Sequence, residues 1–376
     1  MSKILFISSV DYLPWGGSEE LYADTAIELI RMGHQVSIYR RHWLPEPTKI
    51  KQLRNEGCKI LFHSRYLKNK YWRILSKIPA FFGCDLSSRK LKTISETQAD
   101  LVCISEGLPG SGHEWAQACF NNGIPYVTVS HDNSEFVWPD EILANKLIKL
   151  CSKAKKLFYV SENNKRLFER QVGYCFEKTH IIRNPFKASP SLIPWREDPE
   201  LCFAMVGRIQ PNKKGQDLAI AVLAMQKWKD RPIKLRIYGG DSCFSPAIKR
   251  LIKMHGISQV EFMGHVDSVC EIWKDNHILL MPSRNEGLPI TLVEAMHAAR
   301  PAIVTDVAGC TELVVDGENG FVAKAPTVDL LDEAMERAWE ARDMLKGMGL
   351  AARQKVVAEI PENPARVFAD ALLELI

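Results

Sequence analysis

Residues 283 to 296 read Ser283-Arg-Asn-Glu-Gly-Leu-Pro-Ile-Thr-Leu-Val-Glu-Ala-Met296. Glu286 and Glu294 stand eight positions apart, with a Gly-Leu-Pro turn between them. Pro289 suits the first position of a helix, because the N–H that it lacks would be unpaired there. Unpaired amides and the positive end of the helix dipole attract an anion such as a diphosphate. The stretch therefore predicts an anion site at a helix start, with a carboxylate on each side to bind sugar hydroxyls.

The two glutamates taken alone also fit ordinary positions. Glu286 would complement the dipole near the start of the helix. Glu294 would lie on a solvated helix face. The choice between these interpretations depends on the sequence around them.

Short apolar runs alternate with helical stretches in both halves of the chain. These runs are 4–7, 36–39, 59–62, 101–104, 126–129 and 157–160 in the first half, and 203–206, 234–238, 259–262, 278–281 and 302–304 in the second. Buried parallel strands joined by helices produce this alternation. The sequence therefore predicts two doubly wound α/β domains. The segment 189–199 contains three prolines and is expected to be an extended linker between them.

Cations follow the first apolar run of the second half, in Val206-Gly-Arg-Ile-Gln-Pro-Asn-Lys-Lys-Gly-Gln216. Ligands of open α/β sheets bind at the carboxyl ends of the strands. Arg208 can donate two hydrogen bonds to phosphate oxygens, and a neighbouring lysine adds a compact positive charge. The alternative is a loop of solvated cations.

Four further loops carry candidate site residues. Gly16 and Gly17 follow the first apolar run and allow either a close approach of backbone to a ligand or a plain turn. His131 is a candidate on the first domain, and the alternative is a core histidine with satisfied hydrogen bonds. The glycine loops at 238–240 and 262–266 follow strands of the second domain.

A family resemblance covers nearly the whole chain. Residues 285–296, Arg300-Pro-Ala-Ile-Val-Thr-Asp-Val-Ala-Gly309 and Glu312-Leu-Val-Val-Asp-Gly-Glu-Asn-Gly-Phe321 resemble the E-x7-E region of the retaining glycosyltransferases of family 4. The cationic loop resembles that family's Gly-Arg and Lys-Gly element, in which both cations hold the leaving diphosphate. Arg208 matches the arginine, and Lys214 matches the lysine. The adjacent Lys213 leaves the choice of lysine open.

The resemblance implies a GT-B fold, with two doubly wound Rossmann-like domains facing each other across a cleft. The expected parts are an acceptor-side domain at 1–188, the linker 189–199, a donor-binding domain at 200–361 and a final helix, 362–376, packed back on the first domain. The catalytic residues implied are Arg208, Lys214, Glu286 and His131. The donor-binding residues implied are Gly16, Gly17, Gly207, Gly239, Gly264, His265, Gly287, Leu288, Pro289, Ile290 and Glu294.

The expected activity is transfer of a hexose from a UDP- or GDP-type sugar to a hydroxyl, with retention of configuration. We expect no metal and no other cofactor, because no Asp-x-Asp acid pair occurs in the chain. The acceptor would be a glycan, a glycolipid or a small molecule in bacterial polysaccharide, lipopolysaccharide or glycolipid assembly. Two alternatives stay open: a nucleotide-sugar hydrolase or epimerase, and a non-catalytic module that binds nucleotide sugars.

Composition excludes several other classes. The chain has 376 residues, of which 46% are hydrophobic and 25% charged, and this balance is globular. A net charge of +4 without a recognised binding motif argues against nucleic acid. Ten cysteines without a Cys-x-x-Cys pair argue against metal clusters. The sequence shows no signal peptide and no membrane-spanning run, so we expect a cytoplasmic protein.

One segment suggests a peripheral place at the inner face of the membrane. Residues 65–82 interleave cations with aromatic side chains, as suits an anionic lipid surface. A second basic stretch lies at 145–156. The alternative for 65–82 is a solvated helix with an aromatic stripe that faces the core.

Overall fold

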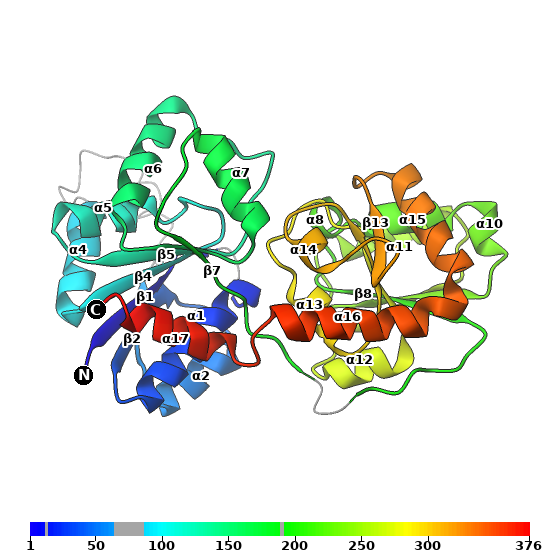
Figure 1. Ribbon diagram of the computed structural model, residues 1–376, viewed down its shortest axis with the longest axis horizontal. Helices are drawn as coiled ribbons and strands as arrows, with labels where there is room; N and C mark the ends of the chain where they lie inside the picture. The colour runs from blue at the N-terminus through cyan, green and yellow to red at the C-terminus, as the bar shows by residue number, and fades with distance from the viewer. Residues whose placement is uncertain (12–13, 64–85, 189–191) are drawn as a thin grey trace. The chain divides into compact units, whose positions relative to one another are not determined.

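The computed structural model describes residues 1–11, 14–63, 86–188 and 192–376 (Figure 1). These residues form two compact units, Met1–Pro185 with Asn363–Ile376, and Phe186–Glu362. Each unit contains one parallel sheet with helices on both faces, so the predicted α/β fold with two doubly wound domains is confirmed. The basic aromatic segment 65–82 lies outside the described residues, and its role in membrane binding stays a prediction.

The sheet of the first unit has the strand order β3-β2-β1-β4-β5-β6-β7, and every neighbouring pair is parallel. The strands are β1 (Lys3–Ser8), β2 (Gln35–Arg41), β3 (Lys59–His63), β4 (Leu101–Glu106), β5 (Tyr126–Ser130), β6 (Leu157–Tyr159) and β7 (Thr179–Ile181). Strand β7 was not predicted. It is a three-residue edge strand without a buried residue, so it leaves no apolar run in the sequence.

Alternate residues of β1 supply the two faces of this sheet. Ile4 and Phe6 pack into the cluster formed with α1 (Gly17–Arg31), α2 (Thr48–Asn55) and α17 (Pro364–Leu373). Leu5 and Ile7 pack into the cluster formed with the helices of the opposite face. Those helices are α4 (Leu86–Thr97), α5 (His113–Asn121), α6 (Glu141–Lys153) and α7 (Glu162–Val172). The central strands are therefore buried on both sides.

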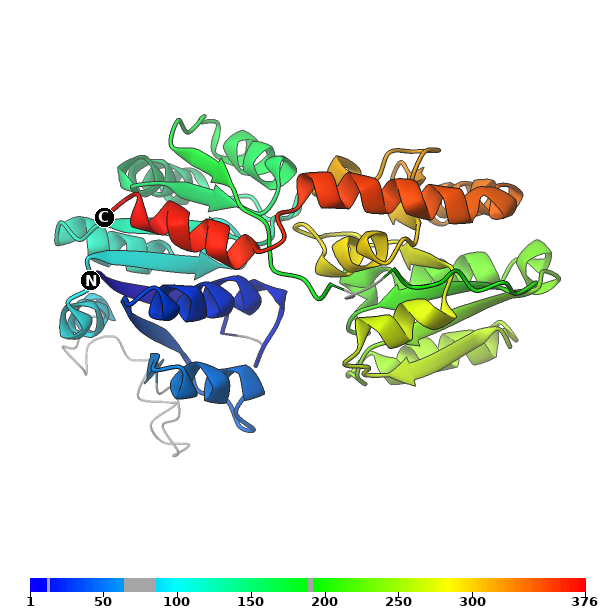
Figure 2. The same cartoon turned by 60° about the horizontal axis from the view of Figure 1, so that its bottom comes forward.

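Helix α17 brings the end of the chain back to the first unit, where it runs beside α1 (Figures 1 and 2). The rings of Phe158 and Phe368 meet edge to face with their centroids 5.0 Å apart. Thr25 donates a hydrogen bond from Oγ1 to the carbonyl of Ala365, over 3.3 Å. The last helix is thus part of the core of this unit.

The sheet of the second unit has the order β10-β9-β8-β11-β12-β13. Its strands are β8 (Leu201–Val206), β9 (Ile233–Tyr238), β10 (Val260–Gly264), β11 (Ile278–Met281), β12 (Ala302–Thr305) and β13 (Gly320–Ala323). The helices are α8 (Pro211–Lys214), α9 (Gln216–Leu223), α10 (Gln226–Lys229), α11 (Ser245–Met254), α12 (Val269–Asp275), α13 (Ile290–His297), α14 (Cys310–Leu313), α15 (Val328–Glu340) and α16 (Leu345–Glu359). Strand β13 was not predicted because it is short and begins with a glycine. A Cβ on Gly320 would lie 2.4 Å from the carbonyl oxygen of Ala302.

A buried arginine fastens the segment before β8 to the second unit. Arg300 is 1% exposed, and its side chain lies over the ring of Trp195. Its guanidinium donates hydrogen bonds to the backbone carbonyls of Ile193, Pro194, Trp273, Asn276, Ala298 and Ala299. Burial lowers its pKa to about 10. The bonds to Ile193 and Pro194 span more than a hundred positions and hold the incoming chain along the sheet.

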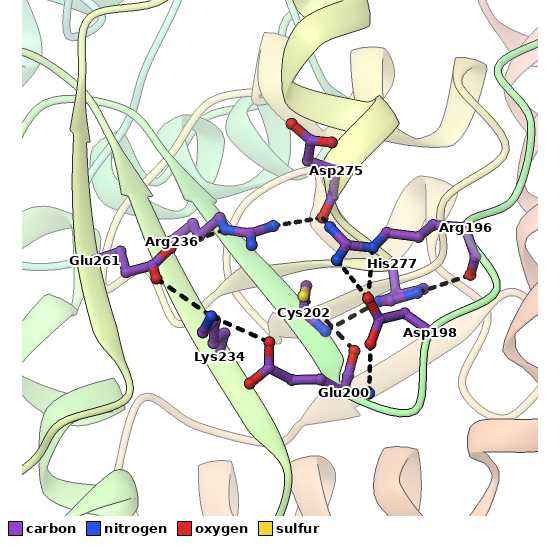
Figure 3. Close-up of polar contacts among 9 residues, drawn as sticks. All are labelled: Arg196, Asp198, Glu200, Cys202, Lys234, Arg236, Glu261, Asp275 and His277. Carbon is purple, nitrogen blue, oxygen red and sulfur yellow. Dashed lines mark hydrogen bonds and ion pairs between the residues drawn. The ribbon is translucent and has the colours of Figure 1, made fainter.

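A charged network continues this attachment at the amino-terminal ends of the strands (Figure 3). Arg196 pairs with Asp198, and Arg196 and Arg236 both donate to the carbonyl of Asp275. His277 accepts the backbone N–H of Cys202 at Nδ1 and bonds the carbonyl of Arg196 through Nε2. The neighbouring pairs are Arg236–Glu261, Lys234–Glu261 and Lys234–Glu200. The network holds the amino ends of the strands, and the loops at their carboxyl ends remain for ligands.

Replacing Arg300 by alanine should destabilise the second unit by about 3 kcal/mol or more, because several buried carbonyls lose their donor. Urea denaturation followed by circular dichroism measures the loss. Arg250→Ala is the control, since Arg250 is exposed on α11, and it should change stability by no more than about 0.5 kcal/mol. A similar effect of both substitutions would show that the carbonyl contacts of Arg300 add little.

Candidate active site

The strand order of the second unit places a ligand site between β8 and β11. All six strands are parallel; from β8 the order continues through β9 to β10 at one edge of the sheet, and from β11 it continues through β12 to β13 at the other edge. Ligands of open parallel sheets bind where the order reverses, beyond the carboxyl ends of the strands. The loops after β8 and β11 carry the two predicted motifs, 206–216 and 283–296. The topology therefore brings both motifs to one place.

Backbone contacts join these two loops. Gly215 ends α8 with a φ of +69°, and a Cβ at this position would lie 1.9 Å from the carbonyl oxygen of Pro282. Arg284 donates its backbone N–H to the carbonyl of Lys213 over 2.7 Å. Its guanidinium makes two bonds to Asp217, of 2.7 and 2.8 Å. Glycine is required at 215 because no side chain fits there.

An ion pair between a partly buried lysine and a buried carboxylate lies at the centre of the site. The Nζ atom of Lys214 is 2.6 Å from Oε1 of Glu286. Glu286 is 5% exposed and also accepts a hydrogen bond of 2.8 Å from Oγ of Ser283. Burial raises the pKa of Glu286, but the charges of Lys214 and Lys213 and the two hydrogen bonds outweigh it, so the pKa lies below its usual value. Glu286 is therefore ionised at neutral pH, and Lys214 is its counterion.

Two glycines bring the neighbouring backbone close to this pair. Gly239 has a φ of +155°, and a Cβ there would lie 2.1 Å from the carbonyl oxygen of Gly207. The Cε atom of Lys214 lies 3.6 Å from the position of a Cβ on Gly207. Arg208 is exposed, and its carbonyl accepts a 3.0 Å bond from Nε2 of the buried Gln216. The lysine side chain thus passes beside the Gly207-Arg208 turn.

Helix α13 begins one residue later than predicted. Pro289 is its N-cap, with φ −67° and ψ 122°, and Ile290 is its first residue. The prediction that Pro289 occupies the first helical position was therefore wrong, because the proline keeps an extended ψ. In the part of the chain that the structure describes, no side chain caps this helix end. Gly287 accepts the N–H of Gly309 over 2.9 Å, and Leu288 is buried.

Further predicted donor-binding residues of the second unit lie on α13 and in the loop after β10. Glu294 is partly buried on α13 and accepts the backbone N–H of Lys187 over 3.2 Å. Lys187 also donates from Nζ to the carbonyl of Asp267, over 3.3 Å. His265 is exposed and lies 3.1 Å from Asp267, while the preceding Gly264 has a φ of +70°. No described contact joins His265 to the Lys214–Glu286 pair.

His131 occupies a buried position in the first unit. Its Nδ1 atom is 3.1 Å from Oδ1 of Asn184, and its Nε2 atom is 3.2 Å from Oγ of Ser105. Burial lowers its pKa to about 4, although the hydrogen bond to Asn184 acts in the opposite direction. The imidazole is thus neutral and hydrogen-bonded on both sides, which is the structural alternative that the sequence left open. Its part in catalysis stays a prediction.

Sequence reasoning missed Glu106, which ends β4 next to His131. Glu106 is 2% exposed and accepts the N–H groups of Gly110 and Gly112, over 2.8 and 3.2 Å. Burial raises its pKa to about 7, against the effect of these bonds and of Ser130. The signal in the sequence is an acid at the end of a strand, followed by a loop with three glycines.

Sequence reasoning also missed Arg40, which holds the glycine loop of the first unit. Gly16 is the N-cap of α1, and Gly17 is its first residue. Arg40 is 3% exposed, donates to the carbonyl of Pro14 over 2.5 Å, and lies over the ring of Trp15. These contacts position the backbone just before the two glycines. The sequence shows only a cation in a strand, and it does not reveal that this cation bonds the carbonyl of Pro14.

Comparisons with known proteins agree with the two-sheet fold. Residues 200–341 match the family described as Glycosyl transferases group 1, and residues 15–189 match Glycosyltransferase Family 4. The structure of Anabaena HepE in complex with UDP superposes with a TM-score of 0.76, at 18% identity over 100% of both chains. This chain is a GT-B glycosyltransferase. The two family matches together support a family 4 type of enzyme.

Two sequence relatives extend over most of the glycosyltransferase. A glycosyltransferase of Methanocaldococcus jannaschii is 24% identical over 80% of this chain and 85% of its own. An α-1,4-N-acetyl-D-galactosaminyltransferase of Campylobacter jejuni is 23% identical over 98% of this chain and 99% of its own. A glycosyltransferase structure from Rickettsia africae has a TM-score of 0.76 at 18% identity and covers 100% of this chain and 98% of its own. Among the described helices, none is long and apolar enough to cross a bilayer.

Acidification should change the contributions of Glu106 and His131 to the stability of the fold in opposite directions. The raised pKa of Glu106 gives stability that is present below about pH 4.5 and is lost as the pH rises through about 7. The lowered pKa of His131 gives stability that is present above about pH 6.5 and is lost as the pH falls towards 4. Between these limits the two effects oppose each other.

Single replacements should separate the two effects. On acidification from about pH 7 to about pH 5, Glu106→Gln should lose more melting temperature than the parent, and His131→Asn should lose less. Differential scanning calorimetry at both pH values measures this. Parallel behaviour of the parent and both variants would contradict the assignment.

Proposed function

We propose that this glycosyltransferase moves a hexose from a nucleoside-diphosphate sugar to a hydroxyl of a glycan, with retention of configuration and without a metal. The proposal rests mainly on the Lys214–Glu286 pair, which lies beside the Gly207-Arg208 turn at the point where the strand order reverses. A cation and a carboxylate held together suit a ligand that has an anionic diphosphate next to a polyhydroxyl sugar.

In this proposal the cations stabilise the leaving diphosphate. Arg208 and Lys214 meet its oxygens, and their charges offset the negative charge that develops as the glycosidic bond breaks. Glu286 accepts hydrogen bonds from sugar hydroxyls, and Glu294 accepts those of the ribose. The N-terminus of α13 contributes its backbone amides. No Asp-x-Asp pair is present in the chain to hold a metal, so these groups carry the charge stabilisation.

Retention follows if the acceptor attacks on the face that the diphosphate leaves. The acceptor hydroxyl then forms the new bond to the anomeric carbon, and the departing diphosphate takes its proton. This step needs no protein base, which agrees with His131, whose two ring nitrogens are both engaged in hydrogen bonds. The family resemblance supports this route.

The relatives support the choice of ligands. Anabaena HepE is described in complexes with UDP and with UDP-glucose, so UDP-hexoses are the first donors to test. The Campylobacter jejuni relative is named for a glycan linked to undecaprenol pyrophosphate. We infer a glycan or glycolipid acceptor and a role in polysaccharide or glycolipid assembly in the cytoplasm.

Donor turnover tests the proposal. UDP-glucose, UDP-galactose, UDP-N-acetylglucosamine and GDP-mannose are incubated with the protein in EDTA, with and without hexoside acceptors, and nucleotide release is measured. We expect release that increases with an acceptor and survives EDTA. Turnover restored only by Mn²⁺ or Mg²⁺ would overturn the metal-free mechanism, and turnover that no acceptor increases would indicate a hydrolase.

In the same assay, Arg208→Ala and Lys214→Ala should each lower kcat/KM by about a hundredfold or more, because each removes a charge-assisted contact in the transition state. Lys213→Ala is the matched control and should do much less, since Lys214 is the lysine bonded to Glu286. A larger loss in Lys213→Ala than in Lys214→Ala would show that Lys213, and not Lys214, supplies the catalytic charge.

A further inference from the structure

Four large apolar side chains are exposed in a short stretch after β5. Phe136 is 85% exposed, Val137 52%, Trp138 55% and Ile142 83%. We call residues 135–142 the aromatic loop. Single exposed apolar residues are common on protein surfaces, but several together mark a binding surface. This loop begins four positions after His131, and none of the predicted site residues lies in it.

Hydrogen bonds of one buried and two exposed side chains hold the aromatic loop in place. Gln171 is 7% exposed and donates from Nε2 to the carbonyls of Ser134 and Val137, over 2.8 and 3.0 Å. Trp138 donates its indole N–H to the carbonyl of Glu135 over 2.8 Å. Asp140 caps α6 by accepting the N–H of Leu143. The apolar side chains are thus presented to solvent by a fixed backbone, which lowers the entropic cost of binding a ligand.

The charges of the loop indicate a ligand other than anionic lipid. Glu135, Asp140 and Glu141 are exposed within the loop itself. Arg170 is bonded to Glu135 over 3.0 Å, so one nearby cation is already engaged. Anionic headgroups attract clusters of cations and are repelled by carboxylates. The acids therefore argue against a phosphatidylglycerol surface as the partner of this loop.

A sugar fits both properties of the loop. One face of a hexose ring presents C–H groups, which can pack on the face of an aromatic side chain. The sugar hydroxyls are hydrogen-bond donors. A carboxylate has about four lone-pair sites, so Glu135 can accept a hydrogen bond from a hydroxyl while it accepts one from Arg170. Aromatic side chains with a few oriented polar groups are the usual lining of a small-molecule site.

We propose that the aromatic loop is the platform for a neutral glycan acceptor, with Phe136 and Trp138 stacking on a sugar ring and Glu135 accepting its hydroxyls. The assignment rests on the proposed function, because the donor residues lie in the second unit and a glycosyltransferase also needs an acceptor site. In this proposal Phe136, Trp138 and Glu135 determine acceptor affinity and take no part in the chemical step.

The test compares acceptor and donor kinetics. Parent, Phe136→Ser, Trp138→Ser and Trp138→Phe are assayed for transfer from the active nucleotide hexose to p-nitrophenyl glucosides, galactosides and N-acetylglucosaminides. We expect the two serine variants to raise the acceptor KM at least tenfold, with the donor KM and acceptor-free donor hydrolysis unchanged. Trp138→Phe keeps an aromatic face and should recover most of the affinity. Met254→Ser, at a residue 70% exposed on α11, is the control.

Two outcomes would overturn the platform. The first is an unchanged acceptor KM in both serine variants. The second is that the parent sediments with phosphatidylcholine–phosphatidylglycerol vesicles and the serine variants do not, which would assign the loop to a bilayer.

Direct binding separates failure of the platform from failure of the proposed function. Saturation-transfer NMR with maltotriose, cellotriose and chitotriose requires no turnover. We expect a signal for at least one of these sugars in the parent and its loss in Phe136→Ser and Trp138→Ser. If the protein shows this difference but no donor turnover, the platform proposal stands and the proposed transferase function fails. Absence of any difference between the parent and these variants would overturn the platform.

Discussion

The ion pair between Lys214 and Glu286 is the interaction on which the site depends. A buried carboxylate is costly without a partner, and Lys214 supplies one from the neighbouring loop. The pair can form because Gly215 lets the end of α8 approach the backbone of Pro282. In return, the carboxylate holds the lysine ammonium in a defined position before any ligand arrives. An anionic diphosphate can then meet a prepositioned charge, which is the condition for efficient electrostatic catalysis.

Much of the fold could be predicted from the sequence, because buried parallel strands leave continuous apolar runs. Such runs mark eleven of the strands, and the order of the motifs along the chain indicates two doubly wound domains. Strands β7 and β13 were missed for local reasons: the first is a short edge strand without buried residues, and the second begins at a glycine in close contact with Ala302. The predicted start of α13 was wrong by one residue, because the preference of proline for the first helical position does not determine its ψ angle.

The proximity of the candidate site residues was predictable where they lie in strand-end loops, and less so where contacts join distant parts of the chain. The sequence left the choice between Lys213 and Lys214 open. The structure shows that Lys214 bonds Glu286 and that Lys213 contributes its carbonyl to Arg284. Arg40, Glu106 and Arg300 were missed. Their partners include backbone groups, which carry no residue signature, and those of Arg300 lie up to 107 positions away.

Calorimetric titration of UDP into the parent, Lys214→Met and Glu286→Gln tests most directly whether this ion pair is a prepositioned phosphate site. We predict that Lys214→Met weakens binding at least tenfold, about 1.4 kcal/mol. Glu286→Gln keeps the shape of the site and leaves the lysine without a competing carboxylate, so it should bind UDP no more weakly than the parent. Equal losses in both variants would contradict this account, because the pair would then support the loop and would not prepare a cation for the diphosphate.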